Sequence, residues 1–293
     1  MHKIDIIINN QKINFSFGPL KFITGSNIEL KYEVIRTLRR HFSGIDSTEY
    51  AIENGLVCGI KIDDKPLDTK RWKYYEIQSR FDFDYDLKLG SKSLSLKYLE
   101  SALVNIEYEP LIQTINNLFK DLEIMIEDML NVIESEIEIK AILPEISLKT
   151  ILKLIELNLY KDDLKMNMYD ISITNLIELQ VRIVKKIAEM NPHNEYIICI
   201  ETLELSNQLM KEVEDHRISN LNFLIITEDK IKTNVSNVVN FSSKIIDFAN
   251  EVDLYNEIIM EAEFQMSMDL LKEYLSAYLT KDEFFGQKIT KYL

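Results

Sequence analysis

The chain has 293 residues, more than most single domains contain, so its length favours two domains. Hydrophobic residues make up 46% of it and include 14 tyrosines and 13 phenylalanines, which excludes a disordered chain. The net charge of −14 excludes broad, charge-driven nucleic-acid binding, so any such binding needs a local basic surface or a bridging cation.

The cysteines and the apolar segments indicate the cellular compartment. Cys58 and Cys199 are far apart and fit no metal-ligand spacing, so we expect free thiols in a reducing cytoplasm. The N-terminal apolar stretch has no cleavage site of a signal peptide, and no apolar window is long enough to cross a bilayer. A cytoplasmic protein without a membrane partner is expected.

The first segment with a functional signature is a strand, a glycine turn and a helix. Strands are predicted at 3–8, 12–17 and 20–24, and the third ends at Gly25. Apolar residues then recur at helical spacing as far as about residue 42. This is the layout of a phosphate-binding loop.

The loop lacks two of the residues that phosphate binding requires. Counted from Gly25, the pattern G-x-x-x-x-G-K-[ST] needs glycine at 30, lysine at 31 and serine or threonine at 32. The chain has Leu30, Lys31 and Tyr32. Without the second glycine the backbone cannot approach a pyrophosphate closely, and tyrosine cannot replace the small hydroxyl that holds Mg²⁺. The sequence therefore predicts a nucleotide-binding scaffold that binds no ATP and is not an enzyme.

Basic residues surround the only tryptophan, Trp72, in a charged stretch. Lys70, Arg71 and Lys73 beside an aromatic ring are typical of a nucleic-acid contact that combines stacking with phosphate binding. A surface hairpin with Trp72 packed underneath is the structural alternative, and both interpretations remain open.

The middle of the chain is helical. From Pro110, apolar residues alternate spacings of four and three, which predicts a helix of about 28 residues with a heptad seam and a second apolar face. Further helices are predicted from Ser147 and from about Asn175. Residues 94–190 are therefore expected to form an elongated helical leg domain.

Strands return after the leg. The apolar strand 196–200 ends at Glu201, a helix is predicted at 203–216, and the strand 221–226 ends at Thr227. In P-loop ATPases an acidic strand end orients Mg²⁺ and water, and the next strand end senses the γ-phosphate. Glu201 and Thr227 occupy those places.

The predicted fold class is thus α/β, with a degenerate P-loop-ATPase-like head formed by residues 1–93 and 191–250 and the helical leg inserted in it. A short edge strand is expected at 244–248, and residues 251–293 are expected to be a C-terminal helical extension, with one helical pattern from 251 to about 281.

Several segments of the chain resemble a known family. They are FITGSNIELK, IESEIEIK, ISLKTILKLIELNL, EYIICIETLELSNQLMKEVE and LNFLIIT. In type and order they resemble the long form of the CRISPR-associated spacer-acquisition protein of type II-A loci. The resemblance implies a P-loop-like head without ATPase activity, a helical leg, and a tetrameric ring around double-stranded DNA ends. It also implies calcium near the head–leg junction, and adaptation partners that are the integrase proteins and the RNA-guided effector nuclease of the locus.

The candidate calcium ligands lie where the resemblance implies that junction. They are Glu134, Glu136, Glu138 and Glu145. Alternate positions on one helix do not face each other, so a solvated helix face is the other interpretation.

The candidate DNA-binding residues come from three basic clusters, any of which could instead be the solvated side of an amphipathic element. They are Arg36, Arg39 and Arg40, then Lys70, Arg71 and Lys73, then Lys140, Lys149 and Lys153. Gly25, Lys31 and Glu201 mark the degenerate nucleotide loop. Two other functions remain open: an active P-loop ATPase or kinase, and a protein-recruiting scaffold that does not touch DNA.

Overall fold

The structure is a computed structural model that describes residues 2–8, 11–45, 47–55, 58–78, 80–104, 108–130, 140–215, 218–260, 266–282 and 284–293. The chain divides into two compact units. One comprises residues 1–81 with 173–293, and the other comprises residues 82–172.

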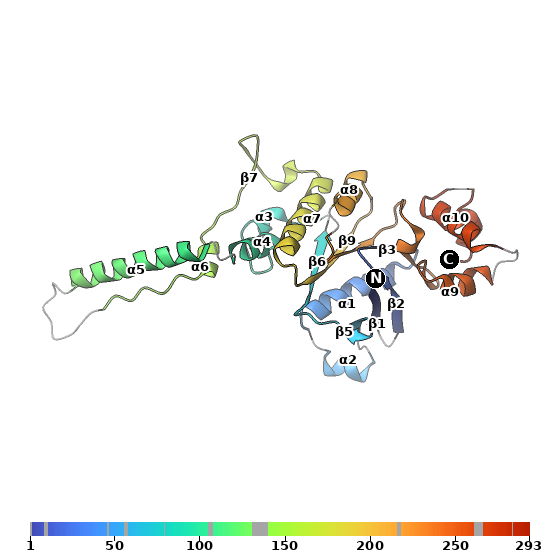
Figure 1. Cartoon of the computed structure of the whole chain (residues 1–293), viewed down its shortest axis with the longest axis horizontal. Coiled ribbons are helices and arrows are strands. Elements are labelled where there is room, and N and C mark those ends of the chain that lie inside the picture. The colour runs from blue at the N-terminus through green and yellow to red at the C-terminus, as the bar shows by residue number, and fades with distance from the viewer. Residues whose placement is uncertain are drawn as a thin grey trace. The chain divides into compact units, whose positions relative to one another are not determined.

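A six-stranded sheet forms the centre of the larger unit (Figure 1). Its strands, in spatial order, are β12 (Ile245–Asp247), β11 (Val238–Phe241), β3 (Leu20–Thr24), β10 (Leu221–Ile226), β9 (Glu195–Glu201) and β6 (Trp72–Gln78). All neighbouring pairs are parallel except β11 with β12. The strands β3 and β10 are buried throughout, as expected for central parallel strands covered on both faces. The predicted α/β class is confirmed.

A second, antiparallel sheet packs nearby. It comprises β2 (Gln11–Phe17), β1 (His2–Ile8), β4 (Gly59–Ile62) and β5 (Lys65–Pro66). The helix α1 (Ile28–Phe42) buries Val34, Ile35 and Leu38 in one hydrophobic cluster with residues of both sheets. The strand–turn–helix predicted around Gly25 is therefore present, and α1 is held between the two sheets.

The helix α7 (Ile173–Met190) belongs to this larger unit, whereas the sequence placed it in the leg. It packs on α8 (Asn207–Asp215), and the fully buried Gln180 bonds to the edge strand β6. The Gln180 side chain accepts from the Gln78 amide at 3.3 Å and donates to its carbonyl at 3.1 Å. In Figure 1, α1 lies on one side of β6 and β9, and α7 with α8 lies on the other. Periodicity predicts a helix but not which core its apolar face joins.

The C-terminal extension is helical but not one helix. It comprises α9 (Glu251–Leu254), a π-helical turn η4 (Tyr255–Ile259), α10 (Met268–Leu279) and α11 (Gln287–Thr290). Ser267 caps α10, because its hydroxyl accepts from the Leu270 amide at 3.3 Å. The helical pattern predicted from 251 to about 281 thus contains more than one helix, because the cap at Ser267 starts a new helix at 268.

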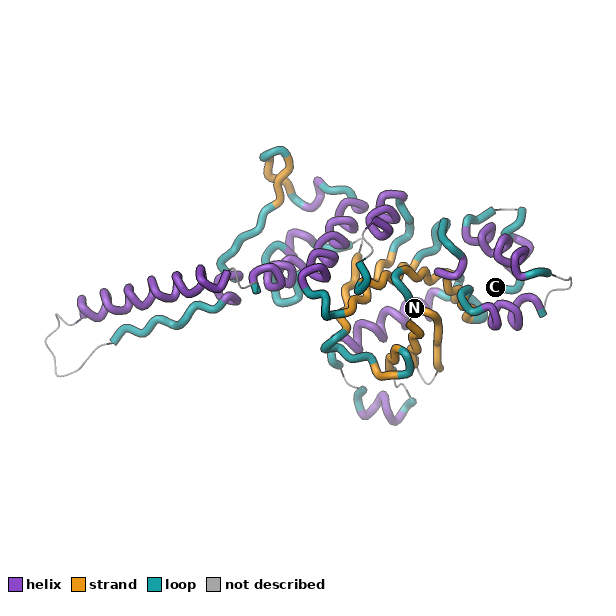
Figure 2. Tube along the Cα trace, in the orientation of Figure 1, coloured by secondary structure: helices purple, strands orange, loops and turns teal. Residues whose placement is uncertain are grey.

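The smaller unit is mostly helical. It contains α3 (Phe83–Asp86), α4 (Leu94–Leu103), α5 (Glu109–Leu130), α6 (Leu148–Leu152), the hairpin β7 (Leu159–Lys161) with β8 (Leu164–Met166), and the short helix η2 (Met168–Asp170). The segment 140–147 runs back along α5 (Figure 2). Asn116 binds both the amide and the carbonyl of Ile146, at 2.8 and 3.1 Å.

The unit begins and ends earlier than the predicted leg, at 82–172 instead of 94–190. Its hairpin β7–β8 lies in a region where the sequence predicted only a helical leg. The remaining short elements of the chain are α2 (Glu49–Glu53) and η3 (Val235–Asn237). Among the described residues, no helix has the combination of length and apolarity that a membrane span requires.

Candidate functional site

The turn after β3 is in close contact with the end of β11 and is hydrogen-bonded to it and to the residue that follows it. Gly25 has a φ of +103°, and a Cβ placed on it would lie 2.3 Å from the carbonyl oxygen of Phe241. The Asn27 amide donates to that carbonyl at 2.8 Å, and the Ser26 amide donates to the Ser242 hydroxyl at 3.3 Å. Gly25 therefore serves a close approach between β3 and β11, a role that needs no ligand.

The start of α1 is also satisfied internally. Asn27 caps the helix by accepting from the Leu30 amide at 3.0 Å, and the Ile28 amide donates to the Ser26 carbonyl at 3.0 Å. A phosphate-binding loop leaves such amides to its ligand. Here the amides of 26, 27, 28 and 30 all have acceptors within the chain.

Lys31 points into the protein and pairs with a carboxylate. The residue is 5% exposed, and its ammonium forms an ion pair with Glu228, whose side chain is 53% exposed. Burial lowers the pKa of Lys31 to about 8. Glu228 follows Thr227 directly, and its carboxylate supplies the negative charge that a bound phosphate would bring. Sequence reasoning missed Glu228, although an acid next to the predicted strand end was the available signal.

Glu201 and Thr227 lie where the parallel strands β9 and β10 end. Glu201 is in register with Ile226, so both residues share the carboxyl edge of the sheet with the turn at Gly25. Glu201 is exposed. Thr227 is buried, and its hydroxyl accepts from the Asp229 amide at 3.1 Å. Ligands of open parallel sheets generally bind at this edge.

The arginines of α1 have partners inside the protein. Arg39 donates two bonds to Glu76 on β6. Burial raises the pKa of Glu76, but hydrogen bonds from Arg39 and Gln78 outweigh it and leave the pKa below its ordinary value. Arg36 pairs with Glu33 at 3.1 Å, and Arg40 donates to the Ile45 carbonyl at 3.3 Å. The charge of Arg39 is therefore largely committed to the fold.

Trp72 is packed inside the protein, as expected if the basic cluster around it has a structural role and does not contact nucleic acid. Trp72 is 6% exposed and meets the His2 ring edge-on, with centroids 5.6 Å apart. The segment is the edge strand β6, not a surface hairpin. Arg71 pairs with Glu195 at 3.7 Å, and Lys73 donates to the Thr69 carbonyl at 3.0 Å. Lys70 is exposed. A buried indole is not available for stacking on a base.

The basic candidates of the smaller unit are all exposed. Lys140 lies in the segment that follows α5, Lys149 lies on α6, and Lys153 is the C-cap of α6. Among the described residues, no ion pair involves Lys149 or Lys153.

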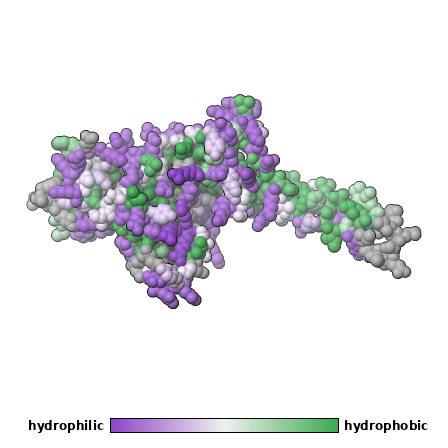
Figure 3. Space-filling view, turned by 180° about the vertical axis from the view of Figure 1, so that it is seen from behind, coloured by the Kyte–Doolittle hydropathy of each residue, from purple (hydrophilic) through white to green (hydrophobic). Residues whose placement is uncertain are grey.

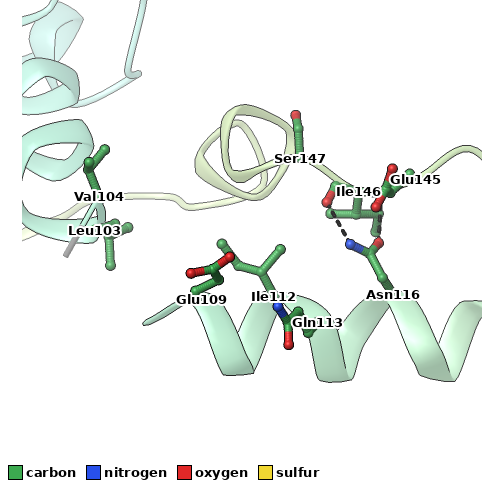
Figure 4. A pocket seen from close by; sticks show the side chains of 9 residues that line it. All are labelled: Leu103, Val104, Glu109, Ile112, Gln113, Asn116, Glu145, Ile146 and Ser147. Carbon is green, nitrogen blue, oxygen red and sulfur yellow. Dashed lines mark hydrogen bonds between the residues drawn. The ribbon is translucent and has the colours of Figure 1, made fainter. Parts of the chain in front are cut away.

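Glu145 lines a cavity of about 460 Å³ in the smaller unit (Figure 4). Glu109 lines the same cavity, together with Asn116, whose amide group is engaged by Ile146. Glu134, Glu136 and Glu138 lie outside the described residues. Within the described ranges, no three histidine, cysteine or acidic side chains gather as a metal site would require.

Cys58 and Cys199 do not form a disulfide. Burial raises the pKa of Cys199 to about 12, so its thiol is unreactive at neutral pH.

No protein-family model matches this chain, and no curated protein matches it by sequence. Among solved structures, the fold is similar to Stu0660 of Streptococcus thermophilus, with a TM-score of 0.73, 16% identity, and coverage of 95% of this chain and 84% of that one. At this identity the likeness shows the fold alone. The recombination mediator RecF, in a structure with ATPrS, aligns over 83% of this chain and 95% of its own at 14% identity, but the TM-score of 0.34 is too low to show a shared fold.

Proposed function

We propose that this chain is a non-catalytic protein that binds double-stranded DNA ends in CRISPR spacer acquisition, as a calcium-stabilised tetrameric ring. The proposal starts from the sequence resemblance to the type II-A spacer-acquisition family. The main support for the proposed lack of catalytic activity is the turn at Gly25. Its amides are bonded to Phe241 and Ser242, and Lys31 is paired with Glu228.

A degenerate P-loop-like head is part of this proposal. Two features support it: the glycine turn between β3 and α1, and the polar ends of β9 and β10 on the same edge of the sheet. The head would retain the strand-to-helix corner of a nucleotide-binding fold as a structural element only.

Self-assembly is supported by the surface of α5. None of its residues is buried, although its sequence carries a heptad seam. Leu118 is 61% exposed and Met125 is 63% exposed. Figure 3 shows hydrophobic residues gathered over α5. An apolar helix face of this kind marks an interaction site, and a further copy of the chain is the partner that a homotetramer supplies.

The described residues bring together fewer oxygen ligands than a calcium ion requires. Calcium takes about six to eight oxygen ligands. The cavity beside α5 offers the carboxylates of Glu109 and Glu145. Glu134, Glu136 and Glu138 remain candidates for the rest, with waters or a second subunit completing the shell. The mass in solution, measured with Ca²⁺ and with a chelator, tests this part: a tetramer that dissociates without Ca²⁺ supports it, and an unchanged mass contradicts it.

Binding to DNA is tested on two topologies. A ring that threads a duplex from its ends shifts linear DNA and fails to shift a closed circle of the same sequence. Equal binding to both topologies, or to neither, would contradict the proposal. Co-purification with the integrase proteins and the RNA-guided nuclease tests the place in adaptation.

An active ATPase or kinase is the alternative that the loop itself suggests. Calorimetric titration with Mg-ATP separates the two, because micromolar binding would require the amides of the turn to leave Phe241 and Ser242. The other alternative is a protein-recruiting scaffold without DNA binding. It is favoured if the basic clusters can be changed to glutamate without loss of adaptation in cells.

A further inference from the structure

A cavity of about 700 Å³ in the smaller unit gathers lysines from three separate segments. Lys88 follows α3, Lys153 caps α6, and Lys165 lies on β8. All three side chains are exposed. Residues 88, 153 and 165 share no sequence pattern, and only Lys153 belongs to a basic cluster predicted from the sequence.

Among the residues that the structure describes, these lysines have no acidic partner, although the chain has many acids. Acidic residues outnumber Lys and Arg by 48 to 34 in the whole sequence. Within the described residues, no ion pair or side-chain hydrogen bond engages Lys88, Lys153 or Lys165. By contrast, Arg39, Arg71 and Lys73 are engaged by partners inside the chain.

The local balance of charge is reversed relative to the whole protein. Three ammonium groups line the cavity against two carboxylates, those of Asp84 and Glu156. The rest of the wall is largely apolar and includes Leu154 and Met166. The aliphatic part of a lysine side chain can pack on such an apolar surface while its ammonium group stays in water. The cavity therefore keeps uncommitted positive charge at the surface of an acidic protein.

We infer that this lysine-lined cavity is a contact surface for the phosphate backbone of double-stranded DNA. Lysine is a flexible point charge that recognises phosphate without reading sequence, which suits contacts to any duplex. The inference rests on the proposed DNA binding and adds its location. An acidic protein segment is the other partner that three lysines could attract.

The test compares two triple variants of the full chain. K88E/K153E/K165E changes the cavity, and K65E/K120E/K211E changes exposed lysines that do not line it. Both shift the net charge by the same amount, so any general repulsion from DNA cancels. Fluorescence anisotropy with a labelled 30-base-pair duplex is measured over a series of salt concentrations.

We expect the cavity variant to bind at least about tenfold more weakly than the control variant. The slope of log K against log salt should also fall by about 2 to 3, because each lysine–phosphate contact contributes about 0.9. K88R/K153R/K165R should bind as the wild type does, because charge and not lysine geometry is required. Circular dichroism and mass in solution check that each variant keeps its fold and assembly, and the single variant K153E should show a partial loss.

Each outcome has a separate meaning. If the wild type fails to bind the duplex, the proposed function falls and takes this inference with it. If the wild type binds and both triple variants bind equally, the function stands and the location is wrong. If the cavity variant loses affinity only for an acidic peptide such as oligoglutamate, with DNA binding unchanged, the surface serves a protein partner and the inference is overturned.

Discussion

Lys31 and Glu228 form an ion pair at the carboxyl edge of the six-stranded sheet, with the ammonium buried and the carboxylate half-exposed. A lysine at this place in an active phosphate-binding loop would face its ligand. Here an internal carboxylate meets it, so the protein neutralises its own lysine.

The buried ammonium of Lys31 predicts a pH dependence of stability. Its pKa is about 8 in the folded protein and about 10.5 when the chain is unfolded. Between these values the unfolded chain holds a proton that the folded chain has lost, so raising the pH favours folding. Below pH 8 Lys31 is protonated in both the folded and the unfolded chain, so its effect on the unfolding free energy no longer changes with pH.

We therefore expect the unfolding free energy of the wild type, relative to Lys31→Met, to rise from pH 8 to pH 10.5 and to be flat below pH 8. Urea unfolding at several pH values measures the difference. Lys65→Met, at an exposed site, is the control and should show no such rise. A flat difference between wild type and Lys31→Met across the whole range would contradict the burial argument.

Gly25→Ala should destabilise the larger unit strongly. Its Cβ would overlap the Phe241 carbonyl, and the backbone has a positive φ, so β11 must shift. We expect a loss of about 3 kcal/mol or more in the unfolding free energy. Gly44→Ala is the matched control, because Gly44 has a φ of +64° and nothing within 4 Å of its Cβ position. It should cost only the conformational strain, about 1 to 2 kcal/mol. Equal losses in chemical denaturation would show that the contact with Phe241 is unimportant.

Trp72 should matter for stability and not for DNA. Replacing its buried indole with a smaller ring in Trp72→Phe removes packing against His2 and should cost about 1 to 2 kcal/mol. DNA affinity, measured by anisotropy below the unfolding transition, should equal that of the wild type. Weaker binding with unchanged stability would instead favour the stacking interpretation.

The apolar face of α5 should control assembly. In L118Q/M125Q two exposed apolar side chains become polar, and we expect a smaller mass in light scattering with little change in the helical content of the subunit. T114Q/N117Q changes polar, exposed positions of the same helix and should leave the mass unchanged. The same mass for both variants would place the subunit contacts elsewhere.

Local structure could be predicted from the sequence where a residue's neighbours along the chain determine its role. The alternation in 12–17 and the run 221–226 predicted β2 and β10, and the missing glycine and hydroxyl after Gly25 predicted a loop unsuited to phosphate. The hairpin β7–β8 was missed because its turn is Asp162-Asp163. Both aspartates adopt positive φ without glycine, as Asp63-Asp64 do between β4 and β5.

The sequence by itself determined the α/β class, the strand–turn–helix at Gly25 and the absence of a complete phosphate-loop pattern, because these depend on short-range spacing. Only the tertiary structure decided that Gly25 serves Phe241, that Lys31 pairs with Glu228 and that Lys88 and Lys165 join Lys153. Residues far apart in sequence meet there through chain topology, and neither periodicity nor composition specifies which side chains share a surface.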